Sequence, residues 1–156
     1  MSGVVLTGGR GFLGWHTRAA LREQASDPTT VPVGAGFDPA LAQAALTGSA
    51  RLIHLAGVNR ASDDEVRDGN VGFATQIAAA LRATDRPPAT VVYANSLQSG
   101  NGTVYGSAKQ EAGDILAAAA AAVGAEFLDI RLPNIFGEHG RPFYNSVTAT
   151  FARLLA

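Results

Sequence analysis

A glycine-rich segment directly after the first apolar run constrains the fold of this chain more than any other feature. Residues 3–6 form a short β-branched run, and the segment that follows it reads Thr7-Gly8-Gly9-Arg10-Gly11-Phe12-Leu13-Gly14. Glycines at positions 8, 11 and 14 allow a tight turn, a close approach of backbone to a pyrophosphate, and close packing of a helix on a strand. The segment therefore predicts a strand, a phosphate-binding loop and a helix that opens with free N–H groups. A tight turn without a ligand is the alternative.

Short apolar runs alternate with longer, alanine-rich segments along the whole chain. The predicted strands cover residues 3–6, 30–33, 51–55, 89–94 and 126–130, and the predicted helices cover residues 12–24, 39–46, 64–83, 105–123 and 146–155. A start at Asn70 is the alternative for the third helix, and Pro32 predicts an edge position for the second strand. The alternation predicts an α/β fold, a Rossmann-like doubly wound parallel sheet of about five strands with helices on both faces. We expect the strand order 2-1-3-4-5 and a single domain over residues 1–156.

Composition and charge exclude several classes of protein. With 12 basic and 13 acidic residues the formal charge is −1, which leaves no basic surface for a nucleic-acid partner. The absence of cysteine excludes disulfides and thiolate metal sites, and we predict no metal site. No apolar stretch reaches the roughly 18 residues of a membrane span, and no charged segment precedes the first apolar run as in a signal peptide. We therefore expect a cytoplasmic protein without a membrane partner.

The tip of the second predicted strand bears on the choice between the two nicotinamide dinucleotides. A carboxylate usually stands there to hold the adenosine ribose, but residues 33–37 contain none, and Asp38 is predicted to cap the helix that begins at Pro39. Nothing at this tip repels a 2′-phosphate, and Arg10 in the glycine loop is placed to bind one. We therefore expect NADP(H) to be preferred over NAD(H). An exposed loop residue without a ligand is the alternative for Arg10.

Tyr105 and Lys109 stand four residues apart in the fourth predicted helix and so share a face. Lys109 is the only lysine of the sequence, whereas arginine supplies eleven positive charges. An ammonium group beside a phenol stabilises the phenolate, which predicts a lowered pKa for Tyr105 and proton transfer at a carbonyl or alcohol oxygen. Ser96 ends the fourth predicted strand, where its hydroxyl is placed to orient the same oxygen. An exposed helix pair and a turn serine are the alternatives.

Several motifs, in order and spacing, resemble the extended short-chain dehydrogenase/reductase superfamily, the NAD-dependent epimerase/dehydratase family, in its nucleotide-sugar-modifying branch. Besides the glycine loop they are His54-Leu55-Ala56-Gly57, Gly69-Asn70-Val71, Ser96, Tyr105 to Lys109, and Arg131-Leu132-Pro133-Asn134-Ile135-Phe136-Gly137. Within that branch the chain is similar to the N-terminal reductase domains of capsular polysaccharide biosynthesis enzymes, through residues 54–60, residues 142–151 and the short gap from Ser96 to Tyr105. The family continues well beyond the length of this chain, so we expect a domain that is truncated relative to the family and lacks most of its C-terminal substrate region.

The resemblance implies a role for each matching position. The catalytic residues would be Ser96, Tyr105, Lys109 and Asn70, with Asn70 steadying a water molecule in a proton relay. The cofactor would be bound by Gly8, Arg10, Gly11, Phe12, Leu13, Gly14, Leu55, Ala56, Gly57, Tyr105 and Lys109. The substrate would be bound by Arg60, Asn134, Tyr144 and Asn145, with His139 and Ser146 as weaker candidates. Solvated loop residues are the alternatives for Arg60 and His139.

The resemblance further implies an NAD(P)-dependent reductase of a nucleotide-linked keto-sugar that uses a Ser-Tyr-Lys triad. An epimerase of the same family and a non-catalytic dinucleotide-binding subunit are the alternatives. A dehydratase ranks lower, because Leu97 and Gln98 follow Ser96 where that activity usually has an acidic pair. Besides the nucleotide-sugar substrate, we expect a homo-oligomer or a completing partner chain, since the apolar segment 147–155 would otherwise lack a cover.

Overall fold

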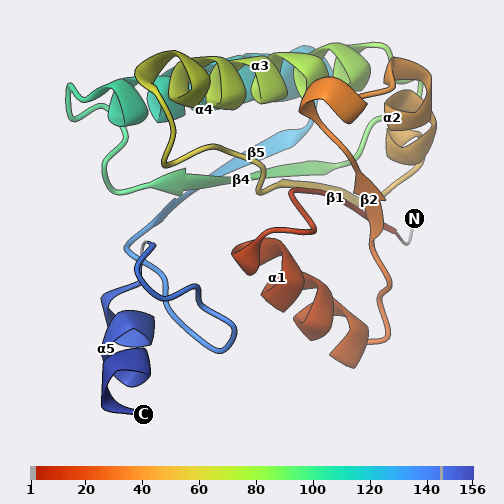
Figure 1. Cartoon of the computed structure of the whole chain (residues 1–156). Coiled ribbons are helices and arrows are strands. Elements are labelled where there is room, and N and C mark those ends of the chain that lie inside the picture. The colour runs from red at the N-terminus through yellow and green to blue at the C-terminus, as the bar shows by residue number, and fades with distance from the viewer. Residues whose placement is uncertain (1–2, 145) are drawn as a thin grey trace.

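Five parallel strands form one sheet at the centre of the molecule (Figure 1). The structure is a computed structural model that describes residues 3–144 and 146–156. The strands are β1 (Val4–Thr7), β2 (Thr29–Val31), β3 (Arg51–His54), β4 (Thr90–Ser96) and β5 (Glu126–Leu132), and their order in the sheet is β2-β1-β3-β4-β5. The predicted order 2-1-3-4-5 is therefore confirmed, and β2 is an edge strand. All five carboxyl ends lie along one edge of the sheet.

The helices follow the predicted segments closely. They are α1 (Phe12–Glu23), α2 (Pro39–Leu46), α3 (Asp63–Arg82), α4 (Val104–Ala122) and α5 (Val147–Leu155), with a 3₁₀ turn, η1 (Gly34–Gly36), before α2. None of the helices in the described part of the chain is both long and apolar enough to cross a bilayer.

Side-chain caps fix where two of these helices begin. Asp38 accepts hydrogen bonds from the backbone of Ala40 and Leu41, at 2.9 and 3.1 Å, and so caps α2 as predicted. Ser62 and Glu65 form a capping box at the start of α3. Because of that box α3 begins at Asp63, and the alternative start at Asn70 is wrong.

The main core lies between the sheet and the layer formed by α3, α4 and α2 (Figure 1). Leu52 and Val91 on the strands pack there with Ile77 and Leu81 of α3 and Leu116 of α4, all of them fully buried. Small residues face one another where α3 and α4 meet the sheet, namely Ala74, Ala78, Ala112, Ala119 and Ala120. The many alanines therefore allow α3 and α4 to pack closely against each other and against the sheet, which buries apolar area.

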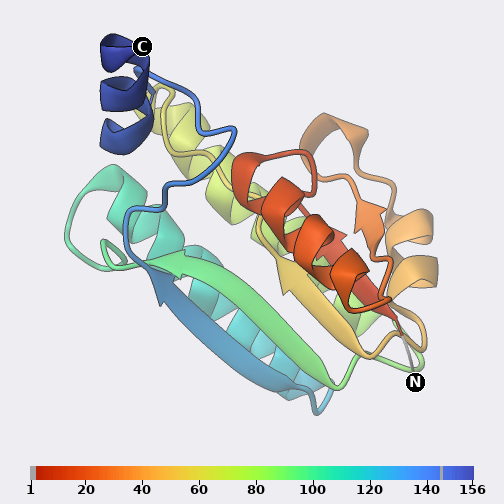
Figure 2. The ribbon, with the colours of Figure 1, turned by 90° about the horizontal axis from the view of Figure 1, so that it is seen from below.

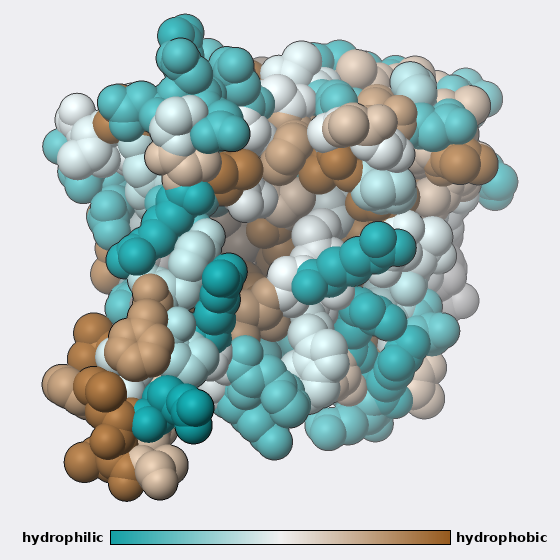
Figure 3. Space-filling model, in the orientation of Figure 1, coloured by the Kyte–Doolittle hydropathy of each residue, from teal (hydrophilic) through white to brown (hydrophobic). Residues whose placement is uncertain are grey.

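The opposite face of the sheet carries α1, which lies over β1 and β3, while β4 and β5 are bare on this side (Figure 2). The prediction of helices on both faces of the sheet is thus confirmed, although on this face a helix covers only part of the sheet. Leu6 beneath α1 is fully buried, whereas Leu128 and Ile130 of β5 are 37% and 43% exposed. Helix α5 buries none of its residues and lies apart from the sheet (Figures 1 and 2). Its apolar side chains form a surface patch at the lower left of Figure 3.

Candidate active site

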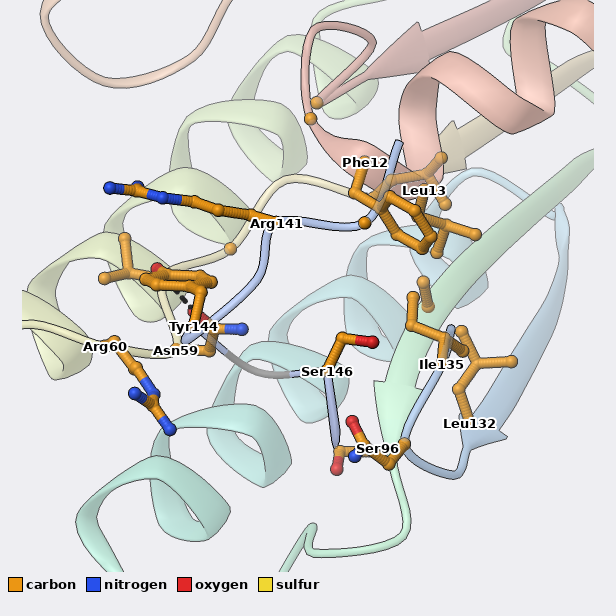
Figure 4. Close-up of a pocket in the computed structure, with 18 of the residues that line it drawn as sticks. Phe12, Leu13, Asn59, Arg60, Ser96, Leu132, Ile135, Arg141, Tyr144 and Ser146 are labelled. Atoms are coloured by element: carbon orange, nitrogen blue, oxygen red, sulfur yellow. Dashed lines mark hydrogen bonds between the residues drawn. The ribbon is translucent and has the colours of Figure 1, made fainter. Parts of the chain in front are cut away.

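A cavity of about 1460 Å³ opens at the carboxyl edge of the sheet. Its walls come from the first turn of α1, the β3–α3 loop, the end of β4, the start of α4 and the segment after β5 (Figure 4). The sheet order changes direction between β1 and β3, and such a switch point is where α/β sheets of this type bind their ligands. The fold thus places the cavity where a ligand site is expected.

The glycine loop forms the floor of this cavity by bringing backbone against backbone. Gly8 adopts a φ of +69°, and a Cβ atom there would lie 2.6 Å from the backbone nitrogen of Ala56. A Cβ atom at Gly14 would overlap the carbonyl oxygen of Gly8. The first hydrogen bond of α1 runs from the Trp15 N–H to the Gly11 carbonyl at 2.9 Å, and no side chain of residues 3–144 or 146–156 caps the helix. The amides of the first turn therefore face the cavity free to bind an anion, and this cradle fits a pyrophosphate.

The end of β3 supports the glycine loop from below. The Thr7 hydroxyl shares a 2.9 Å hydrogen bond with Nδ1 of His54 and accepts one of 3.4 Å from the Ala56 N–H. Leu55 and Gly57 line the cavity. Ala56 does not line it: the residue is 8% exposed, because its backbone packs beneath Gly8. The structure therefore places Ala56 behind the cavity wall, and its predicted contact with the cofactor stays a prediction.

Ser96, at the end of β4, and Tyr105 and Lys109, both on α4, all line the cavity. Burial raises the pKa of the Tyr105 phenol, and a hydrogen bond with Ser96 opposes this rise. The predicted lowering of this pKa by Lys109 is not seen. The Lys109 ammonium group instead donates a 2.7 Å hydrogen bond to the Ala94 carbonyl and lies 4.2 Å from the centre of the Tyr93 ring. Burial lowers the pKa of Lys109 to about 8.

Asn70, in the middle of α3, presents a free amide oxygen to the same region. Its Nδ2 donates hydrogen bonds of 2.7 Å to the carbonyls of Val58 and Val66, while its Oδ1 is buried and has no partner among the described residues. A Cβ atom at Gly57 would lie 2.7 Å from this oxygen and 4.0 Å from Nζ of Lys109. The side chains of Asn70 and Lys109 thus border one small polar space beside Gly57, and a buried acceptor of this kind is usually satisfied by water.

An aromatic and cationic cluster forms the opposite wall. The guanidinium carbons of Arg60 and Arg141 lie 5.5 and 5.2 Å from the centre of the Tyr144 ring, and the Tyr144 hydroxyl donates a 3.0 Å hydrogen bond to Oδ1 of Asn59 (Figure 4). Asn134 lines the cavity as well. This wall therefore offers positive charge and hydrogen bonds to a ligand.

Three further predicted positions lie in or near the segment after β5. The His139 ring contacts the Trp15 ring at 4.7 Å between centroids, and Ser146 caps α5 through the Ala149 N–H at 3.1 Å. Both residues line the cavity. Asn145, predicted to bind substrate, lies outside the residues that the structure describes.

Sequence reasoning missed Asn59, Tyr93 and Arg141. Tyr93 lies in the predicted strand 89–94, where nothing in the sequence distinguishes it from an ordinary core residue. Asn59 and Arg141 lie in loops, where polar residues are common. Asn59 and Tyr144 are 85 positions apart in the chain, so only the structure shows that they are hydrogen-bond partners. The available signal was the presence of polar residues in or next to residues 54–60 and 142–151, the two stretches that carry the resemblance to the capsular polysaccharide enzymes.

The strand, glycine loop and helix, together with the serine, tyrosine and lysine at the carboxyl edge, define a Rossmann domain of the short-chain dehydrogenase/reductase type. The model of the NAD dependent epimerase/dehydratase family matches residues 4–156, and the chain belongs to this family.

Individual relatives agree with this assignment. The UDP-2-acetamido-2,6-beta-L-arabino-hexul-4-ose reductase of Pseudomonas aeruginosa is 33% identical over 152 residues, which are 95% of this chain and 40% of that protein. The capsular polysaccharide assembling protein CapF of Staphylococcus aureus superposes with a TM-score of 0.74 and 32% identity, over 95% of this chain and 40% of CapF. The UDP-N-acetylglucosamine 4-epimerase of Bacillus cereus shares the fold, with a TM-score of 0.77 and 16% identity over 92% of this chain and 57% of the epimerase. The chain thus spans about 40% of the length of the first two relatives.

Substitution of two helical glycines tests the backbone packing of the loop. We expect Gly14→Ala to lower the free energy of unfolding by about 1–3 kcal/mol, because the new methyl group meets the backbone of Gly8 and Gly9. Gly72→Ala is the matched control, since a Cβ atom there meets nothing within 4 Å. That control should raise the free energy of unfolding by about 0.5–1 kcal/mol. Urea denaturation measures both, and equal midpoints for Gly14→Ala and the wild type would refute the packing argument.

Proposed function

We propose that residues 1–156 form one NAD(P)-binding domain of a reductase that acts on a nucleotide-linked keto-sugar. The observation that carries this proposal is the placement of Ser96, Tyr105 and Lys109 in the same cavity as the pyrophosphate cradle. The Pseudomonas relative, named as a reductase of a UDP-linked hexulose, supports the choice of substrate class. Positive charge on the wall around Tyr144 suits the diphosphate of such a substrate.

The cofactor residues act mainly through their backbone. Gly8, Gly11 and Gly14 leave room for a pyrophosphate, and the amides of Phe12 and Leu13 would donate hydrogen bonds to it. Leu55 and Gly57 border the path from adenosine to nicotinamide, with Ala56 supporting it from behind. Lys109 would donate a hydrogen bond to the nicotinamide ribose. When bound, the reduced cofactor supplies the hydride for the substrate carbonyl.

The protein's own part in the reaction is the movement of a proton. Because burial raises the pKa of Tyr105, its phenol is protonated at neutral pH and ready to donate to the carbonyl oxygen of the substrate. Ser96 orients that oxygen, and the positive charge of Lys109 stabilises the phenolate that remains. The free Oδ1 of Asn70 holds a water molecule through which the proton is replaced. Arg60, Asn134, Tyr144 and Asn145 bind the nucleotide sugar.

Tyr105→Phe tests this assignment. The variant should lose about 10²- to 10⁴-fold in kcat with a UDP-linked 4-keto-sugar, because it has no proton to donate. Its NADPH binding should weaken by about tenfold at most, the loss of one hydrogen bond to the cofactor. Calorimetry measures the binding, and absorbance at the NADPH band measures the turnover. Unchanged turnover would contradict the role of Tyr105.

The wild type distinguishes the alternative functions in the same assay. Product formation without net NADPH consumption would identify an epimerase. Tight NADPH binding with no reaction of any candidate sugar would identify a non-catalytic dinucleotide-binding subunit.

We further propose that NADP(H) is preferred over NAD(H). Asp38, the nearest carboxylate after β2, is engaged in capping α2, and Arg10 is exposed at the cavity. Arg10→Gln should therefore weaken NADPH binding by about tenfold, the loss of one charge-assisted hydrogen bond, and leave NADH binding unchanged. Calorimetry with both dinucleotides on both proteins checks this, and equal losses for NADH and NADPH would assign Arg10 to the shared pyrophosphate instead.

We also propose that the chain acts as a homo-oligomer, with a completing partner chain as the alternative. Val147, Phe151, Leu154 and Leu155 share one side of α5 and are each 60% exposed or more. The pair Phe151→Ser and Leu154→Ser should reduce self-association, because it removes the apolar area that drives it. Light scattering over a range of concentrations measures the mass, and a monomeric wild type at every concentration would exclude the homo-oligomer.

A further inference from the structure

Lys109 is a buried positive charge without a carboxylate partner. The residue is 5% exposed, and the ion pairs among the described residues join Arg22 to Asp27, Arg131 to Asp129, and His139 to Glu138. Burial of an unpaired ammonium group is costly, so other contacts must offset its lost hydration. One of these contacts is the hydrogen bond of 2.7 Å to the Ala94 carbonyl, which by itself leaves two of the three N–H donors to be accounted for.

Tyr93 supplies the second contact and holds Lys109 at two points. Its ring centre lies 4.2 Å from Nζ, and its hydroxyl donates a 3.3 Å hydrogen bond to the backbone carbonyl of Lys109. The ring cannot swing away, because Tyr93 is 1% exposed and packed between two neighbours. On one side lies His54 of β3, whose ring centroid is 5.8 Å from that of Tyr93. On another side lies Gly113 of α4, where a Cβ atom would be 3.5 Å from Cε1 of Tyr93.

The titratable groups around this contact leave the charge of Lys109 intact. Burial and the charge of Lys109 lower the pKa of His54 to about 3, so its ring is neutral and adds no second positive charge. Tyr93 is neutral as well, because burial raises its pKa. Asp129 stands opposite Tyr93 on β5, raises the pKa of Lys109 through its charge, and is bonded to Arg131 at 3.3 Å. Tyr105 is the other titratable group that the described residues place at this wall.

We propose that Tyr93 is a positioning residue whose ring face holds the Lys109 ammonium group in the site in the place of a carboxylate. The inference rests on the proposed function in one respect, the use of that charge at Tyr105. A carboxylate in contact with Lys109 would cancel most of the field that reaches the phenol. An aromatic ring attracts a cation through its quadrupole and carries no net charge, so it stabilises the ammonium group and leaves its field available.

The single lysine makes the test direct. Protein grown with lysine labelled with ¹³C at Cε gives one lysine signal, whose shift with pH reports the pKa of Lys109 without any substrate. Tyr93→Phe keeps the ring face, and the pKa should stay within a few tenths of the wild-type value. Tyr93→Leu removes the face, and the pKa should fall by about one unit, since a desolvated cation–π contact contributes on that order. An unchanged pKa in a folded Tyr93→Leu protein would overturn the proposal.

Fluorinated phenylalanine at position 93 covers the case in which Tyr93→Leu does not fold. Trifluorophenylalanine nearly retains the size of phenylalanine while it weakens the negative potential of the ring face. The pKa of Lys109 should then fall relative to Tyr93→Phe, and equal values for the two rings would refute the contact.

Turnover separates this inference from the proposed function. If the chain reduces a keto-sugar, the pH profile of NADPH oxidation should shift across the same variants in step with the pKa measured by NMR. A shift in the NMR pKa without any turnover would uphold the contact and reject the function. Turnover together with the same Lys109 pKa in every variant would uphold the function and reject the contact.

Discussion

The close approach of two backbones, at Gly8 and Ala56, is the constraint on which the rest of the site depends. Only a residue without a Cβ atom allows the chain leaving β1 to turn this tightly against the end of β3. Gly14 extends the same contact, since its bare backbone lets the first turn of α1 lie against the carbonyl of Gly8. The hydrogen bond between Thr7 and His54 then ties the two strands together beneath the turn. The orientation of α1, and with it the direction of its free amides, follows from these contacts.

Close packing also fixes the second half of the site. Alanines on α3 and α4 bring both helices near the sheet and near each other, so that Asn70 of one and Lys109 of the other border one space beside Gly57. Larger residues at those positions would separate the helices and move the two polar groups apart. The polar space is therefore a consequence of small side chains in the core, and its geometry is set by layers that extend well beyond the cavity.

Much of this arrangement can be predicted from the sequence, because its strongest signals are local. The glycine loop, the alternation of apolar runs and the cap at Asp38 predict the elements to within about two residues and the strand order as well. The cavity also gathers most of the predicted site residues, including Ser96, Tyr105 and Lys109. The features that the sequence does not predict depend on contacts between distant segments. They are the packing of Gly8 over Ala56 and the hydrogen bond between Asn59 and Tyr144. Such contacts follow from how the layers pack, which no local pattern records.

The direction of the Tyr105 pKa shows why spacing alone is not sufficient. A lysine four residues away on one helix predicts a stabilised phenolate, yet burial of the phenol favours its neutral form, and the Lys109 ammonium group is turned to the Ala94 carbonyl and the Tyr93 ring. In the proposed carbonyl reduction the two effects would suit different stages. A neutral phenol is needed before the proton is given, and a nearby positive charge is needed once the phenolate has formed. If the Tyr93 ring stabilises the charge of Lys109 as proposed, the site would meet both requirements, because burial keeps the neighbouring Tyr105 phenol protonated.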